Sequence, residues 1–166
     1  MAKFVTLMKS FLFVCVAPGT IAGLVPWLVT RWQVQPPFFG QPSLKDLGMA
    51  LILLGLVPLA ESFVRFVWKG VGTPAPFIPA RRLAVSGFYR YVRNPMYIGV
   101  LAVILGQALW LGEVRLLLYA GVVWLISHLF IVAYEEPMLR RNFAEQYADY
   151  HANVPRWLPR LTAWQA

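Results

Sequence analysis

Two short stretches of the chain carry most of the side chains suited to binding a charged ligand. The first, SGFYRYVRNPMYIG at residues 86–99, combines two arginines, one asparagine and three tyrosines at the edge of an apolar run. The second is Tyr134, Glu135 and Glu136. Fixed cations, hydroxyl groups on flat rings and adjacent carboxylates suit a zwitterion that carries a planar base. We expect the two stretches to form one site; the alternative is that the glutamates are solvated at a helix end.

Patterns typical of other chemistries are missing from the sequence. It contains no GxGxxG after a predicted strand, no P-loop and no HExxH. The single cysteine, Cys15, lies inside an apolar run and has no thiol partner for a metal or a disulfide. We therefore predict no metal ligands and a site that works by positioning its reactants.

The composition places this site in a membrane protein. The 166 residues are 59% hydrophobic and 13% charged, with a mean hydropathy of +0.60. This is too apolar for a soluble domain of that size. The net charge of +8 does not indicate nucleic-acid binding, because the basic residues fall between apolar runs. We expect membrane lipids, and no nucleic acid, as partners.

The order of apolar and polar segments predicts an all-α membrane bundle. A hydrocarbon core of roughly 30 Å takes about 20 helical residues. Four apolar runs approach this length, at residues 10–32, 44–68, 95–111 and 114–133. The last two are separated only by Gly112 and Glu113, so they should form an antiparallel hairpin. Residues 135–151 predict a C-terminal amphipathic helix, and residues 153–160 an extended tail.

The first run contains two features that affect helix geometry. Pro18 and Pro26 should bend it, since proline removes an intrahelical hydrogen bond. Gly19 and Gly23 form a small-xxx-small pair that would let another helix approach closely. The alternative is that they reflect the frequency of glycine in membrane helices.

The basic residues predict the orientation. Most Lys and Arg residues lie in the N-terminal segment, in the connection at residues 69–93 and in the C-terminal segment. By the positive-inside rule, these segments face the cytoplasm. We expect a multi-pass protein of the cell inner membrane with both termini and the site on the cytoplasmic side.

Polar residues within or near the apolar runs are candidates for the acceptor side of a reaction. Glu61 and Arg65 stand four apart on one helical face, either as a structural ion pair or near a substrate. His128 lies on about the same face as Glu135, either as a helix-to-helix contact or near a substrate. The candidate catalytic residues are Glu61, Arg65, His128 and Arg140.

Several ordered motifs support a family resemblance. They are RNPMYIG at 93–99, EEPML at 135–139, then Phe143, Tyr147 and Tyr150, and VPR at 154–156. Together they resemble the superfamily of isoprenylcysteine carboxyl methyltransferases and phospholipid N-methyltransferases, which are integral membrane enzymes. The upstream GTPAPFIPARRLAVSGFYRYVRNP is similar to its bacterial branch. The resemblance covers residues 70–159, and Asn94 stands where many members have histidine.

The resemblance implies methyl transfer from S-adenosyl-L-methionine to a small lipophilic or amphiphilic carboxylate, amine or thiol. The sequence shows no repeat and no second domain, so we expect one domain over residues 1–166, with N-terminal helices at 1–69. The resemblance implies a catalytic core at 70–166 whose helical hairpin forms the cofactor site. The implied cofactor-binding residues are Tyr89, Arg93, Asn94, Pro95, Tyr97, Tyr134, Glu135 and Glu136. As surface-lining positions, Glu136 and Tyr97 should each affect stability by less than about 1 kcal/mol.

Two other functions stay open. Membrane reductases of the sterol-reductase type share a similar C-terminal pattern and use NADPH, although the short length and the paired glutamates weigh against them. A non-catalytic helical scaffold would explain the hydropathy and the Glu61–Arg65 spacing, but not the polar residues at 86–99. The oligomeric state does not follow from the sequence.

Overall fold

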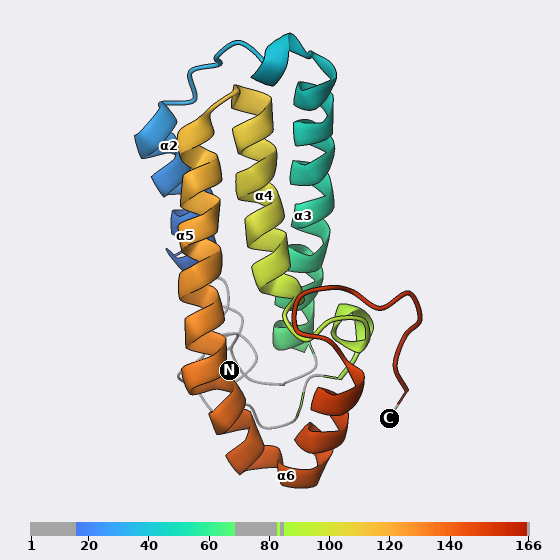
Figure 1. Ribbon diagram of the computed structural model, residues 1–166. Coiled ribbons are helices and arrows are strands. Elements are labelled where there is room, and N and C mark those ends of the chain that lie inside the picture. The colour runs from blue at the N-terminus through green and yellow to red at the C-terminus, as the bar shows by residue number, and fades with distance from the viewer. Residues whose placement is uncertain (1–15, 69–82, 84, 166) are drawn as a thin grey trace.

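The computed structural model describes residues 16–68, 83 and 85–165, without the side chains of Phe63 and of residues 65–68. In this part the chain is helical and contains no strand (Figure 1). The elements are η1 (Thr20–Leu24), α2 (Val25–Thr30), η2 (Phe38–Gly40), α3 (Ser43–Trp68), η3 (Gly87–Arg90), α4 (Pro95–Leu111), α5 (Val114–Phe130), η4 (Ile131–Glu135) and α6 (Glu136–Asn153). The predicted all-α architecture is therefore confirmed for the described residues.

Three helices form the body of the bundle, with α4 between α3 and α5 (Figure 1). Two helices are long and apolar enough to cross a membrane, within Ser43–Ser62 and Val114–Asn153. The apolar helices Val16–Thr30 and Pro95–Leu111 are shorter. Two of the four predicted spans thus reach the length needed to cross a membrane. The first predicted run, residues 10–32, begins before residue 16, where the described part of the chain starts.

Four glycines bring the backbones of α3 and α4 into direct contact. Gly48 faces Gly106, and Gly55 faces Gly99, as expected for antiparallel helices. A Cβ atom on Gly55 would stand 2.8 Å from the carbonyl oxygen of Gly99, and one on Gly106 would stand 2.6 Å from that of Gly48. Only glycine permits so close an approach. This contact fixes the start of α4, where the first of the two predicted site stretches ends.

Of the glycine pair that the sequence suggested, the structure tests Gly23. A Cβ atom on Gly23 would meet no atom of the described residues within 4 Å, so no described helix packs closely against this glycine. The glycines of α3 and α4 instead stand one heptad apart within each helix, a spacing that keeps them on one face.

A π turn precedes Pro26, one of the two prolines at which the sequence predicts a bend. In η1 the N–H of Val25 donates to the carbonyl of Thr20 rather than to that of Ile21. Pro26 has no N–H to donate to the carbonyl of Ala22. The carbonyl groups of Ile21 and Ala22 therefore lose their donors within the helix.

Side chains of the bundle satisfy both of these carbonyl groups. Tyr119 Oη donates to the Ile21 carbonyl at 2.9 Å, and Gln107 Nε2 donates to the Ala22 carbonyl at 2.6 Å. Lipid offers no hydrogen-bond donors, so these contacts hold the first helix against α4 and α5.

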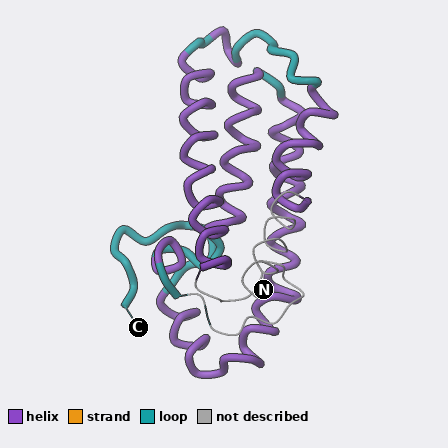
Figure 2. The backbone as a smooth tube through the Cα atoms, turned by 180° about the vertical axis from the view of Figure 1, so that it is seen from behind, coloured by secondary structure: helices purple, strands orange, loops and turns teal. Residues whose placement is uncertain are grey.

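The chain passes from α5 into α6 without leaving the helix. The sequence predicted an apolar run at 114–133 and a separate helix at 135–151, but η4 joins them through a second π turn. Because about 20 residues cross a hydrocarbon core, the spanning segment that begins at Val114 ends near Ala133. At Ala144 the backbone leaves the helical region (φ 35°, ψ −110°), and the chain then turns back toward the start of α4 (Figure 2).

The glycine contact predicts a position-specific loss of stability. Replacing Gly55 or Gly106 with alanine should destabilise the protein by about 2 kcal/mol, because the new methyl group overlaps a backbone oxygen that cannot move away alone. Gly121 in α5 is the matched control, since a Cβ atom there meets nothing within 4 Å. Unfolding in detergent followed by circular dichroism measures the effect. Equal stability of Gly55→Ala and Gly121→Ala would contradict the packing.

Candidate active site

The two predicted stretches meet at the polar end of the bundle. Pro95 occupies the first turn of α4, where a missing N–H leaves no helical bond unmade. Close to it, Tyr97 Oη lies 3.4 Å from Oε2 of Glu135, and Arg93 Nη1 lies 3.0 Å from Oε1 of Glu136. The expectation that these residues lie together is therefore confirmed.

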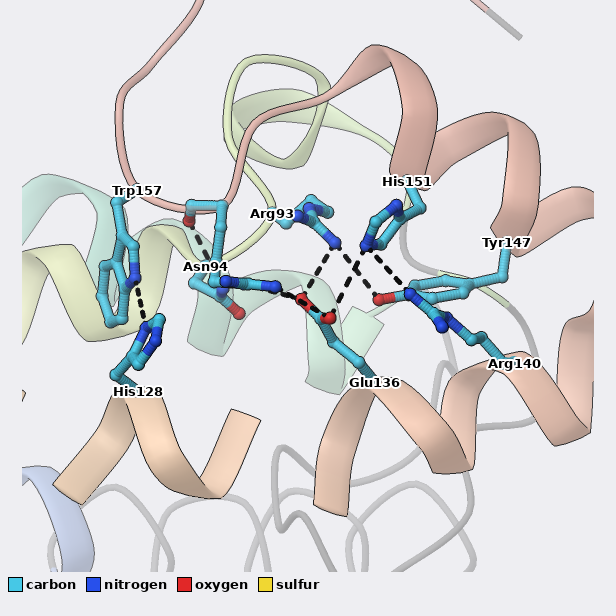
Figure 3. Close-up of polar contacts among 9 residues, drawn as sticks. Arg93, Asn94, His128, Glu136, Arg140, Tyr147, His151 and Trp157 are labelled. Atoms are coloured by element: carbon cyan, nitrogen blue, oxygen red, sulfur yellow. Dashed lines mark hydrogen bonds and ion pairs between the residues drawn. The ribbon is translucent and has the colours of Figure 1, made fainter. Parts of the chain in front are cut away.

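Glu136 is the centre of a buried ion cluster (Figure 3). Its Oε1 accepts from Arg93 Nη1 at 3.0 Å and from Arg156 Nε at 2.7 Å, and its Oε2 accepts from Arg156 Nη2 at 3.0 Å. His151 Nε2 lies 3.6 Å from Oε2, and Tyr147 Oη lies 3.5 Å from Arg93 Nη1. Protein groups thus use both oxygens of Glu136.

The charge of Glu136 is balanced within the cluster, beyond the spanning segment. Burial raises the pKa of its carboxyl group, but the hydrogen bond from Arg156 and the charges of Arg93 and Arg156 outweigh it. The net pKa of Glu136 lies below its usual value. The same hydrogen bond raises the pKa of Arg156. Glu136 is therefore ionised at neutral pH.

The C-terminal tail pairs with the stretch before α4. Three backbone bonds of 2.9 Å join them: Arg93 N–H to the Pro155 carbonyl, Arg160 N–H to the Tyr91 carbonyl, and Trp164 N–H to the Arg90 carbonyl. The tail therefore covers one side of the candidate site, and together with Arg156 it links the end of the chain to α6.

Side chains reinforce this pairing. Asn94 is buried, and its Nδ2 donates to the Arg156 carbonyl at 3.3 Å. Tyr150 Oη donates to the Tyr89 carbonyl at 2.8 Å. The Asn94 amide thus joins the stretch before α4 to the C-terminal tail.

Glu135 differs from its neighbour. One of its oxygens accepts from Tyr97, and no arginine of the described chain pairs with it. Burial raises the pKa of Glu135 to about 7, against the lowering effect of the Tyr97 hydrogen bond and together with the charge of Glu136. Tyr134, just before it, is 41% exposed and packs on Phe130 with ring centroids 5.2 Å apart.

The predicted acceptor-side residues contact different segments. Glu61 Oε2 accepts from the N–H of Phe88 at 3.1 Å, which places this carboxylate beside η3. The side chain of Arg65 lies outside the described residues, and so does its predicted pairing with Glu61.

His128 and Arg140 also lie apart from each other. His128 Nδ1 accepts from Trp157 Nε1 at 3.1 Å (Figure 3). The His128 ring also stacks on Trp124, with ring centroids 5.4 Å apart. The histidine therefore joins α5 to the tail. Arg140 is exposed and lies 3.3 Å from His151 Nε2, at the outer edge of the ion cluster.

Two buried side-chain atoms of the described residues lack a hydrogen-bond partner, Arg93 Nε and Ser62 Oγ. A buried donor without a partner costs about 1–3 kcal/mol, and an acceptor group of a ligand would remove this cost at Arg93. Among the residues described, no three His, Cys, Asp or Glu side chains lie close enough to hold a metal ion.

Several related proteins share this part of the chain. A model of the phospholipid methyltransferase family matches residues 45–146. A protein-S-isoprenylcysteine O-methyltransferase of Schizosaccharomyces pombe is 36% identical over 80 residues, which are 48% of this chain and 34% of that protein. An uncharacterized protein of Haemophilus influenzae is 35% identical over 63 residues, 38% of this chain and the whole of that protein. The chain thus aligns with about a third of the yeast relative, and no solved structure matches it significantly.

The expectation that Glu136 lines a surface is wrong, because the residue is 5% exposed and bound by two arginines. The sequence argument missed Arg156 as its partner, although Arg156 belongs to the VPR triplet on which the resemblance drew. A buried carboxylate, unlike one at the surface of a site, destabilises the protein when its positively charged partners are removed.

Glu136→Gln should therefore destabilise the protein by about 3 kcal/mol, since it leaves the charges of buried Arg93 and partly buried Arg156 without a counter-charge. Glu145→Gln, at an exposed position of α6, is the matched control and should change stability by less than about 0.5 kcal/mol. Thermal unfolding in detergent compares the two variants. Equal stability of both would contradict a structural role for the cluster.

Proposed function

The chain belongs to the phospholipid methyltransferase family, and we propose that it is a membrane methyltransferase using S-adenosyl-L-methionine. The proposed acceptor is a small lipophilic or amphiphilic molecule, or a lipid, with a carboxylate, amine or thiol. One observation carries the proposal: Arg93 and Tyr97 meet Glu135 and Glu136 at the polar end of an apolar bundle. A water-soluble methyl donor and a lipid-soluble acceptor have access to the same place only at such an end.

The proposed reaction requires little acid–base catalysis from the protein. S-adenosyl-L-methionine supplies a methyl group on a sulfonium, whose S–C bond breaks as the bond from acceptor to carbon forms. The protein has to align the two reactants and exclude water, and this orientation alone lowers a barrier by several kcal/mol. Rigid positioning groups, rather than a nucleophile or a metal, meet this requirement.

The residues of the candidate site fit the amino-acid end of such a donor. Arg93 Nε is a buried donor without a partner, suited to a carboxylate. Glu135 is a carboxylate that no arginine of the described chain occupies, suited to an ammonium group. Glu136 is a positioning residue in this proposal, because it acts through Arg93. Asn94, Pro95, Tyr97, Tyr89 and Tyr134 form the proposed wall around the donor.

The remaining polar residues are the proposed acceptor side. Glu61 lies beside η3 and His128 lies beside the tail, so each flanks the proposed donor site from a different segment. We place Arg65 and Arg140 in the same group on their charge. The proposed setting is the cell inner membrane, with both termini and the site facing the cytoplasm, in agreement with the charge distribution.

Calorimetric titration in detergent tests this function. S-adenosylhomocysteine should release or absorb heat on binding, whereas NADPH should not. Glu135→Gln should weaken the binding of S-adenosylhomocysteine about tenfold or more, because it removes one charge-assisted contact. Glu145→Gln should stay within about twofold of the unchanged protein. Binding of NADPH alone would identify a reductase. If neither ligand produces heat, the non-catalytic scaffold is the remaining interpretation.

The pH dependence of binding provides an independent test. A carboxyl group with a pKa of about 7 is mostly protonated at pH 6 and mostly ionised at pH 8. An ammonium group prefers the ionised form, so affinity for S-adenosylhomocysteine should rise through this window and approach a tenfold change per pH unit below pH 7. Glu135→Gln should bind with an affinity that does not change between pH 6 and 8. A pH-independent affinity of the unchanged protein would exclude Glu135 as the contact.

A further inference from the structure

Two apolar side chains of the C-terminal tail are almost completely exposed. Leu158 is 80% exposed and Leu161 is 100% exposed, and the segment that holds them, residues 157–161, contains no acidic residue. Single exposed leucines are common on protein surfaces and need no explanation. Here the depth at which the tail is held, relative to the apolar helices, decides what these two side chains meet.

The contact of the tail with α5 gives a first measure of this depth. Trp157 Nε1 donates to Nδ1 of His128 at 3.1 Å, and the rings of Trp157 and Trp124 have centroids 6.2 Å apart. The spanning segment that begins at Val114 ends near Ala133, and His128 stands before that end in the sequence. At 1.5 Å per residue, Trp157 is therefore held roughly 7 Å inside the span.

The contact of the tail with the stretch beside α3 gives a second measure. Arg160 N–H donates to the carbonyl of Tyr91, which directly follows η3, and the N–H of Phe88 in η3 donates to Glu61 Oε2. The apolar span of α3 ends at Ser62. In both views the tail lies level with the start of α4, whereas α6 extends farther from the bundle (Figures 1 and 2). Both helices thus place the tail at the edge of the apolar span.

The backbone of the tail decides between the hydrocarbon core and its boundary. The N–H groups of Leu158 and Leu161 donate to no carbonyl of the described residues, and Pro159 has no N–H. Acyl chains offer no acceptor for such groups, whereas lipid head groups and interfacial water do. The side chains of Trp157 and Arg160 favour the same boundary, since each combines an apolar body with a polar end.

We propose that residues 157–161 dock into the boundary between the lipid head groups and the acyl chains, with Leu158 and Leu161 as apolar anchors. The occupant of this surface is the membrane that the bundle spans. The docking also concerns the candidate site, because the same tail covers one side of it through backbone bonds to Arg93 and Tyr91. The inference depends on the apolar spans and not on the methyl donor, so its test and the calorimetric test succeed or fail independently.

Nitroxide labels at single positions of the full chain report this depth. Cys15 is the one cysteine of the sequence, so Cys15→Ala gives a background in which each added cysteine carries the label. The test variants are Leu158→Cys and Leu161→Cys. Ile126→Cys, at a position of α5 that is 62% exposed, is the lipid-facing control, and Glu145→Cys, at an exposed position of α6, is the water-facing control. All four replace exposed side chains, so each variant should keep the fold.

The labelled variants are compared in vesicles of phosphatidylcholine and phosphatidylglycerol in equal amounts. Electron paramagnetic resonance measures collisions of the label with oxygen, which concentrates in lipid, and with a nickel chelate, which stays in water. The ratio of oxygen to nickel collisions at positions 158 and 161 should be severalfold larger than at position 145 and approach the ratio at position 126. A ratio equal to that at position 145 would overturn the proposal. Dipolar broadening at position 158 or 161 that disappears on dilution with unlabelled protein would also overturn it, because a second copy of the chain would then cover the leucines.

Discussion

The buried carboxylate of Glu136 is the interaction on which the polar end of this molecule depends. A charge removed from water must be paired, and Arg93 and Arg156 supply that pairing from two other segments of the chain. The cluster thereby joins the stretch before α4, the start of α6 and the C-terminal tail. The backbone hydrogen bonds between Arg93 and Pro155 and between Arg160 and Tyr91 join the same stretch and the tail. A helix bundle thus acquires a folded end that can position a ligand.

A second constraint is the demand of an apolar environment that polar groups find partners. The bundle meets it in the first helix, where Tyr119 and Gln107 satisfy the carbonyl groups that Pro26 and its π turn release. Two buried side-chain atoms of the described residues, however, have no hydrogen-bond partner. Arg93 Nε lacks a partner, and so does Ser62 Oγ in α3. Of these two exceptions among the described residues, Arg93 Nε lies where the proposed ligand binds.

Much of this arrangement could be predicted from the sequence. Hydropathy located the bounds of α3, α4 and α5 closely, since a long apolar run in lipid can satisfy its backbone hydrogen bonds as a helix. The short turn at Gly112 required that α4 and α5 form a hairpin. The meeting of residues 93–97 with 134–136 followed from the order of the motifs. The burial of Glu136 did not, because it depends on Arg156, which reaches the cluster only after the chain reverses at Ala144. Likewise, the contact between His128 and Trp157 depends on the path of the tail, and the glycine contact depends on the register of α3 against α4.

The central claim is that the segments joined by Glu136 bind the methyl donor as one unit. Hydrogen exchange of the full chain in lipid nanodiscs, read by mass spectrometry with and without S-adenosylhomocysteine, tests this most directly. The account predicts slower exchange in three segments together: residues 87–97, residues 131–139 and residues 155–164. Binding that slows exchange in only one of these segments, or that slows it elsewhere in the bundle, would contradict the account.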